Sequence, residues 1–134
     1  MASELKVDKF TGVTTAGSIL VTGEGNSTTT NLQQGLAKQW SQSNASTVLV
    51  DSFNTTSLTD NGTGDTTTIL TNIMGNALYS VVVSTGNTAA NPSNYGASSA
   101  PVDTSSHRSK SWNSADGSLF DTGFKSKAVL GDLA

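Results

Sequence analysis

Residues 46–71, STVLVDSFNTTSLTDNGTGDTTTILT, decide the fold class of this chain. Apolar runs rich in β-branched residues flank a dense group of Asp, Asn and Gly that extends from Asp60 to Asp65. Asn and Gly tolerate a positive φ, and Asp accepts hydrogen bonds from its own turn, so this group is typical of a turn. We therefore predict a strand over 46–53, then a hairpin with strands around Leu58 and over 66–71, joined by a loop of about four to six residues.

The C-terminal part continues this rhythm of strands and turns. Ala77–Thr85 (ALYSVVVST) is its most apolar run, and the three consecutive valines predict a strand that is buried on both faces. An Asp116-Gly117 turn joins the first two of three shorter predicted strands, over 107–112, 119–124 and 127–130. This spacing predicts a mainly β fold, an antiparallel sandwich or small barrel, over residues 46–134.

One long segment interrupts these strands. Residues Gly86–Thr104 contain two prolines and many small side chains, and they predict a loop. A loop of this length within a compact domain is usually functional or mobile. Tyr95 is the candidate in this loop for an exposed contact, and packing of its ring against Pro92 is the alternative.

An extended arm, residues 1–27, precedes the β domain. Glu4–Phe10 alternates apolar and polar side chains, and Ser18–Thr22 is a short β-branched run, so both segments predict strands. An exposed strand can add to the edge of a sheet in another protein. The side chains that we expect to make such a contact are Leu5, Val7, Phe10, Ile19 and Val21.

A short helix is predicted between the arm and the β domain, over residues 28–41. Leu32, Leu36 and Trp40 recur at four-residue steps and would share one helix face. A helix of this length is marginal alone in water, so this face needs a partner. The partner is either the protein's own sheet or a copy of the helix around a symmetry axis, and both alternatives stay open.

The composition predicts a thin core. Ser, Thr, Asn and Gly make up 64 of the 134 residues, whereas Leu, Ile, Val and Phe make up 28. The latter fraction is close to the level of about 20% below which a core becomes doubtful. We therefore expect a homo-oligomer, in which neighbouring subunits add to the burial.

Charge and residue usage exclude several classes of partner. The chain has no cysteine, so it can form neither disulfides nor thiolate metal sites. No apolar run approaches the ~20 residues that a membrane span needs, and Met1–Lys6 lacks the apolar centre of a signal peptide, so we expect synthesis in a cytoplasm. With a net charge of −3 and seven dispersed basic residues, nucleic acid is not an expected partner.

No motif in the sequence predicts catalysis. His107 is the single histidine, and no serine lies in a G-x-S-x-G elbow, so we expect His107 to be a surface or packing residue. The Asp60–Asp65 loop has two carboxylates that could ligate Ca²⁺, but its spacing differs from an EF-hand and turn chemistry accounts for every residue. We predict no enzyme activity, no cofactor and no metal site.

Three blocks carry a resemblance to a known family. They are the opening MASELKVDKFTGVTTAGSILVTGEGNSTTTNLQQGLAKQW (Met1–Trp40), the stretch DSFNTTSLTDNGTGDTTTILTNIMGNALYSVVV (Asp51–Val83) and the ending GDLA (Gly131–Ala134). Together they resemble small virion structural or tail-fibre-like proteins of marine tailed phages. Two residues depart from the pattern: Thr66 stands where the family tends to have an aromatic or aliphatic residue, and Leu130 where a histidine is common.

The resemblance implies a β-rich, trimeric component on the exterior of the virion, with no catalytic residues. We expect capsid decoration, as a cement protein or head fibre that contacts the major capsid protein through the arm. The alternative is a tail fibre or tail-tip subunit that contacts tail proteins and a host receptor, with a host surface glycan as a further candidate partner. A free carbohydrate-binding or hydrolytic β domain is the third reading, and it rests on fold analogy alone.

Overall fold

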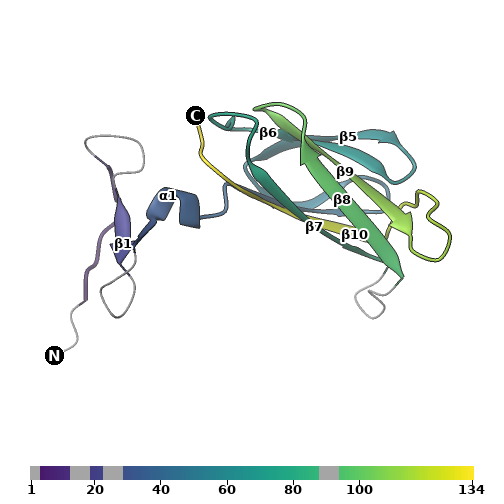
Figure 1. Cartoon of the computed structure of the whole chain (residues 1–134), viewed down its shortest axis with the longest axis horizontal. Coiled ribbons are helices and arrows are strands. Elements are labelled where there is room, and N and C mark those ends of the chain that lie inside the picture. Colours follow the sequence, from purple (N-terminus) through teal and green to yellow (C-terminus); the bar gives the residue numbers. More distant parts are fainter. Residues whose placement is uncertain (1–3, 13–18, 23–28, 88–93) are drawn as a thin grey trace. The chain divides into compact units, whose positions relative to one another are not determined.

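The computed structural model describes residues 4–12, 19–22, 29–87 and 94–134, and this part of the chain is mainly β (Figure 1). Ten strands form three antiparallel sheets, which confirms the predicted mainly β, antiparallel class. The chain divides into two compact units, residues 1–35 and residues 36–134. The second unit, Leu36–Ala134, is called the β body below and contains the predicted β domain over 46–134.

The first unit contains a two-stranded ribbon. β1 (Leu20–Thr22) pairs antiparallel with β2 (Thr29–Asn31), and α1 (Leu32–Gly35) follows directly. β1 lies within the predicted strand over 18–22. The predicted strand Glu4–Phe10 is wrong, because residues 4–12 contain no strand and none of the described strands pairs with them.

The predicted helix over 28–41 is wrong for most of its length. Only Leu32–Gly35 is helical, and Trp40 lies in β3 (Gln39–Asn44), where buried and exposed side chains alternate. Side chains four residues apart share one face of a strand as well as one face of a helix. The spacing of the predicted face therefore did not discriminate between the two structures.

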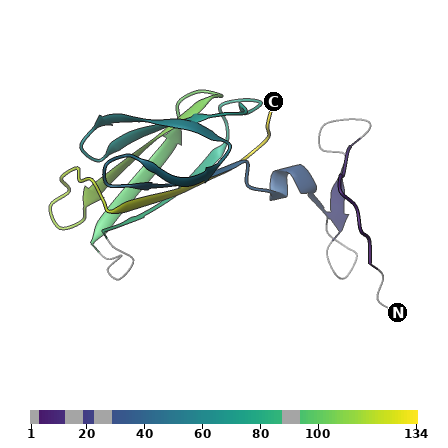
Figure 2. The ribbon, with the colours of Figure 1, turned by 180° about the vertical axis from the view of Figure 1, so that it is seen from behind.

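Eight strands build the β body as two four-stranded antiparallel sheets, which Figures 1 and 2 show from opposite sides. Sheet 1 has the order β4-β3-β10-β7, and sheet 2 has the order β5-β6-β9-β8. The further strands of sheet 1 are β4 (Leu49–Phe53), β10 (Phe124–Leu130) and β7 (Ser80–Gly86). The strands of sheet 2 are β5 (Thr55–Gly62), β6 (Asp65–Leu70), β9 (Ser106–Asn113) and β8 (Tyr95–Pro101).

The two sheets face each other as a sandwich. Lys125 on β10 donates from Nζ to Thr66 Oγ1 on β6 at 3.1 Å, and Lys127 Nζ donates to Thr68 Oγ1 at 2.9 Å. Along one side β7 lies next to β8, and Ser99 Oγ donates to the Val81 carbonyl at 2.9 Å. These bonds identify the inner face of each sheet.

The apolar core of the β body is small. Four buried side chains form it, and Val81 and Leu133 pack against them; the four are Leu70, Met74, Tyr79 and Val129. The Tyr79 hydroxyl donates to the Ser106 carbonyl at 2.5 Å, so its polar end is satisfied. Among the residues that the structure describes, no other apolar cluster of buried residues accompanies it.

Two details of the predicted hairpin and loop are corrected. The strands of the hairpin continue to Gly62 and from Asp65, so that the turn is Thr63-Gly64 alone. Gly64 has φ +68°, and a Cβ there would lie 2.4 Å from the Ser111 carbonyl oxygen, so only glycine fits. The predicted loop 86–104 contains β8, whose residues, including small Ser and Ala, pair with β9. Residues 88–93 of the predicted loop lie outside the described part.

Two strand predictions also change. Val82 is 56% exposed, so β7 is covered on one face and not on both. The predicted strand over 119–124 is reduced to an isolated bridge between Leu119 and Trp112, and β10 begins at Phe124.

No helix of the described residues is long and apolar enough to cross a membrane.

Candidate functional site

The space between the two sheets is lined mainly by polar side chains. Every second residue of β3, β6, β9 and β10 points into it. Apart from Leu70 and Val129 of the apolar core, these residues are polar and nearly or fully buried: Gln39, Ser41, Ser43, Lys125, Lys127, Thr66, Thr68, His107, Ser109 and Ser111. Hydroxyl groups take the place of aliphatic groups here because Ser and Thr alternate along these strands. Lys125 and Lys127 donate hydrogen bonds across this space to Thr66 and Thr68, whereas Gln39 Oε1 and Ser43 Oγ have no partner among the described residues.

The buried basic groups of this interior have perturbed pKa values. Burial, together with the neighbouring Lys125 ammonium, lowers the pKa of Lys127 to about 8. Burial and the Lys127 ammonium lower the pKa of His107 to about 4, so the imidazole is neutral at pH 7. Neither ring nitrogen of His107 has a hydrogen-bond partner among the described residues.

Perturbed pKa values often mark catalytic groups, but enclosure argues otherwise here. His107 is fully buried and each of the two lysines is only 3% exposed, so a substrate in solution cannot reach them. The sequence predicted a surface or packing role for His107, and the structure places it in the interior packing. The sequence did not predict that these lysines are buried. Lys125 and Lys127 stand at alternate positions, and such a pattern is typical of the solvent-exposed face of a strand.

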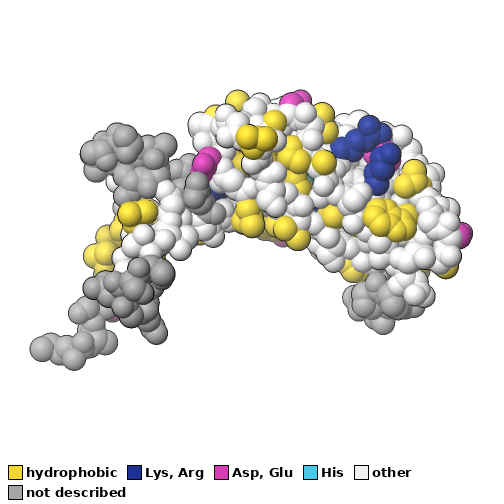
Figure 3. Space-filling model, viewed as in Figure 1, with side chains coloured by type: hydrophobic (Ala, Val, Ile, Leu, Met, Phe, Trp, Pro, Cys, Tyr) yellow, Lys and Arg dark blue, Asp and Glu magenta, His cyan; other side chains and the backbone are white. Residues whose placement is uncertain are grey.

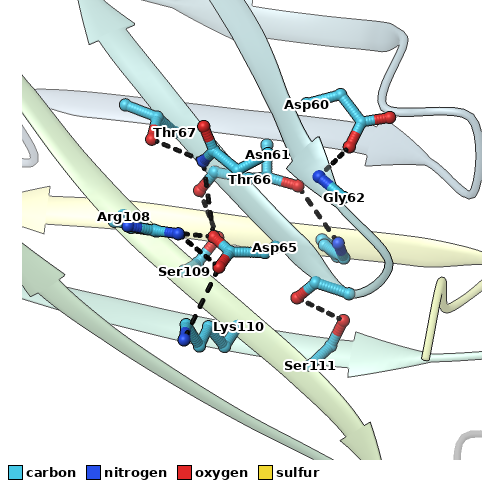
Figure 4. A network of polar contacts seen from close by, with 12 residues as sticks. Asp60, Asn61, Gly62, Asp65, Thr66, Thr67, Arg108, Ser109, Lys110 and Ser111 are labelled. Carbon is cyan, nitrogen blue, oxygen red and sulfur yellow. Dashed lines mark hydrogen bonds and ion pairs between the residues drawn. The ribbon is translucent and has the colours of Figure 1, made fainter. Parts of the chain in front are cut away.

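The outer face of sheet 2 carries an ion-pair network centred on Asp65 (Figure 4). Arg108 donates from Nε and Nη2 to the two carboxylate oxygens of Asp65, at 2.6 Å each, and Lys110 Nζ lies 3.6 Å from Oδ2. Asn61 Nδ2 donates to Asp65 Oδ1 at 3.3 Å and to Thr67 Oγ1 at 2.8 Å. The hydrogen bonds from Arg108 lower the pKa of Asp65, which therefore stays ionised at neutral pH.

Trp112 extends this face along β9. Positions 108, 110 and 112 alternate with buried positions, so their side chains share the outer face of sheet 2. Gly96 on β8 is the register partner of Trp112, and a Cβ at Gly96 would lie 2.3 Å from Cε2 of the indole. The indole thus lies against the backbone of β8. We call Asp65, Arg108, Lys110 and Trp112 the basic face.

The outer face of sheet 1 carries an apolar row across all four strands. The register pairs Phe53 with Trp40, Trp40 with Ala128, and Ala128 with Val82. Phe53 is 53% exposed, Trp40 42% and Val82 56%. These four residues are called the apolar row. The next register row on this face is polar: Asp51, Gln42, Ser126 and Ser84.

The remaining predicted site residues lie in several places. Leu36 is exposed in the β body and Leu32 opens α1, so the predicted face of Leu32, Leu36 and Trp40 does not form. Of the arm side chains, Ile19 is partly buried and four are exposed: Leu5, Val7, Phe10 and Val21. Tyr95 opens β8 and stacks on Phe120 with ring centroids 5.4 Å apart, so Phe120 and not the undescribed Pro92 is its observed partner.

The carboxylates of the predicted turn already have partners. Asp60 Oδ1 accepts a hydrogen bond from the Gly62 amide at 2.9 Å, and Asp65 accepts from Arg108. No group of three or more His, Asp or Glu side chains that could hold a metal ion occurs in the described ranges. Turn chemistry therefore accounts for Asp60, and the Arg108 pair accounts for Asp65.

No family model, curated protein or solved structure matches this chain.

Proposed function

We propose that this chain is a non-enzymatic structural protein of the exterior of a tailed-phage particle, acting as a homo-oligomer in capsid decoration. The single observation that carries the proposal is the apolar row on sheet 1. The interior is largely polar, and the exposed row includes Trp40 and Phe53. Most monomeric proteins instead bury such large apolar side chains and expose polar ones. An apolar patch of this kind is typical of an interaction surface.

Size indicates that the row acts together with other contacts. Each half-exposed aromatic side chain of the row offers on the order of 100 Å². A stable interface needs about 800 Å² from each partner. We propose that the arm supplies part of the difference through Leu5, Val7 and Phe10, which are exposed, and that both surfaces meet the major capsid protein or neighbouring copies, as in a trimer.

The proposal also includes the absence of catalysis and a location on the particle exterior. Its perturbed basic groups are enclosed between the sheets, which favours a structural role over catalysis. The resemblance of Met1–Trp40 and Asp51–Val83 to virion proteins supports a place on the particle exterior after synthesis in the host cytoplasm. Neither nucleic acid nor a membrane is a proposed partner.

Copy number tests the proposal. Quantitative mass spectrometry of purified particles of the encoding phage, measured against the major capsid protein, should give hundreds of copies. Deletion of residues 1–22 should abolish binding of added protein to particles that lack it, whereas the substitution Lys9→Gln should not. Absence of the chain from purified particles would contradict a virion role.

A second candidate function is a tail-fibre or tail-tip subunit that contacts a host receptor, including a surface glycan. The specific observation in its favour is the basic face, where Arg108 and Lys110 are about half exposed beside Trp112. A small copy number, in multiples of three or six, would support this candidate over capsid decoration.

A further inference from the structure

The exposed cations of the β body lie together on one face, whereas its exposed carboxylates are dispersed. Six of its carboxylates are exposed at scattered positions: Asp51, Asp60, Asp103, Asp116, Asp121 and Asp132. Of its five basic residues, three are buried: Lys38, Lys125 and Lys127. In the described part of residues 36–134, Arg108 and Lys110 are therefore the exposed cations, and Figure 3 shows the basic surface beside hydrophobic side chains.

Asp65 orients Arg108 through two hydrogen bonds and forms an ion pair with Lys110. The Arg108 pair uses Nε and Nη2, so the Nη1 group takes no part in it and points its donors elsewhere. The Lys110 ammonium has three donors and lies at the edge of the same carboxylate. Because Asp65 is only 8% exposed and Asn61 also binds it, the anchor is rigid. Such preorganised donors lose little entropy when they bind an anion.

Trp112 places a flat apolar surface next to the cations. Successive side chains on one face of a strand are roughly 7 Å apart, so the indole and the Lys110 ammonium can touch one small ligand. Ser98, the register partner of Lys110, adds an exposed hydroxyl from β8 on the same face. An aromatic platform with hydroxyl donors and charge-assisted donors around it fits a sugar ring that carries an acidic group.

We propose that the basic face binds an anionic sugar, with the ring against Trp112 and its carboxylate or phosphate on Lys110 and Arg108. Charge complementarity selects this occupant, since Arg108 and Lys110 are the exposed cations among the described residues of the β body. Two exposed cations are too few for a nucleic-acid track, which needs a basic stripe. The inference relies on the tail-fibre candidate only for the source of the sugar, a host cell surface.

Titration of the purified full-length chain tests this site. The probes are a galacturonic acid trimer, mannose 6-phosphate and a neutral galactose trimer, followed by calorimetry and by amide chemical shifts in NMR. The two acidic probes should bind at least about tenfold more tightly than the neutral one, as one charge-assisted pair implies. A preference between the two acidic probes tells carboxylate from phosphate. Equal affinity for the neutral probe, or tighter binding of single-stranded DNA, would overturn the proposal.

Variants locate the binding. Lys110→Gln should weaken acidic-sugar binding about tenfold, because it removes one charge-assisted contact. Lys9→Gln makes the same charge change at an exposed position of the first unit and should leave affinity unchanged. Gly96→Ala keeps both cations but displaces the indole, so it should weaken all sugar binding while amide shifts outside this face stay in place.

Two outcomes distinguish this inference from the proposed function. Equal weakening by Lys110→Gln and Lys9→Gln would mean that binding is non-specific and would overturn the site. That result would leave capsid decoration untouched, because copy number on the particle does not depend on the basic face. Sugar binding by a protein that is absent from virions would retain the site and refute the virion role.

Discussion

The inside of the β body is mainly polar, whereas the outside of sheet 1 carries a row of exposed apolar side chains. Apart from Leu70 and Val129, the inner positions of β3, β6, β9 and β10 carry hydroxyl, amide, imidazole and ammonium groups, whereas the outer positions of sheet 1 carry the apolar row. Most domains bury aliphatic groups and expose charges. Hydrogen bonds between the sheets therefore replace part of the usual apolar packing, and apolar side chains remain on an exposed face that we propose as an association surface.

The largest predicted effect on stability comes from an apolar replacement of Lys127 in the interior. A buried lysine whose pKa falls from 10.5 to about 8 costs stability at pH 7, up to about 3 kcal/mol. Lys127→Met should therefore raise the free energy of unfolding at pH 7 by about 1–3 kcal/mol in urea titrations. The advantage should shrink as pH rises from 8 to 10.5, since the unfolded lysine then also loses its proton.

The control for this prediction is Lys9→Met, an exposed lysine of the first unit. It should change the free energy of unfolding by less than about 0.5 kcal/mol at either pH. A Lys127→Met protein that is less stable than the parent at pH 7 would mean that the Lys127–Thr68 bond outweighs the cost of burying the charge.

The second predicted effect is a loss of stability in acid that is caused by the buried His107. Its pKa is about 4 in the folded chain against 6.5 in the unfolded chain, so the unfolded state binds more protons between these values. Stability should fall by up to about 3 kcal/mol as pH drops from 6.5 to 4. The loss should be smaller in His107→Leu, when urea unfolding is followed at half-unit steps.

Other groups titrate in this range too, so the difference between the two proteins carries the result. Lys127 faces His107 from β10 and keeps its proton throughout the range. Identical pH profiles for parent and His107→Leu would show that His107 is not buried in the neutral form.

A third, smaller effect removes one hydroxyl from the interior. Thr68→Val keeps the shape of the side chain but leaves Lys127 Nζ without its 2.9 Å partner. An unsatisfied buried donor costs about 1–3 kcal/mol, so thermal and urea unfolding should both show a loss of about 2 kcal/mol. Thr59→Val, at an exposed position of β5, is the matched control and should be nearly neutral.

The smallest effect on stability concerns the apolar row. Trp40→Gln should lower the free energy of unfolding of the monomer by only about 1 kcal/mol, because Trp40 is 42% exposed and only its covered part loses contacts. Self-association, measured by light scattering during gel filtration, should nevertheless weaken. Gln42→Ala in the adjacent polar row should leave it unchanged. Unaltered association of Trp40→Gln would remove the row from the interface and return attention to the arm.

The local sequence determined the mainly β class and several strands. The Asp60–Asp65 group marked the hairpin, and β-branched runs marked β1, β4 and β7, because turn chemistry and side-chain alternation act over a few residues. β8 was missed, since its small side chains resemble those of a loop and only the ladder with β9 makes it a strand.

Tertiary structure alone decided which face of each strand is inside and which residues form sites. Alternation gives every strand two faces, but the choice between them depends on the opposing sheet, here on β6 hydroxyls that accept from β10 lysines. The pair of Asp65 with Arg108 joins residues 43 positions apart, and the apolar row joins β4, β3, β10 and β7. Such contacts follow from strand order and register, which no short-range pattern encodes.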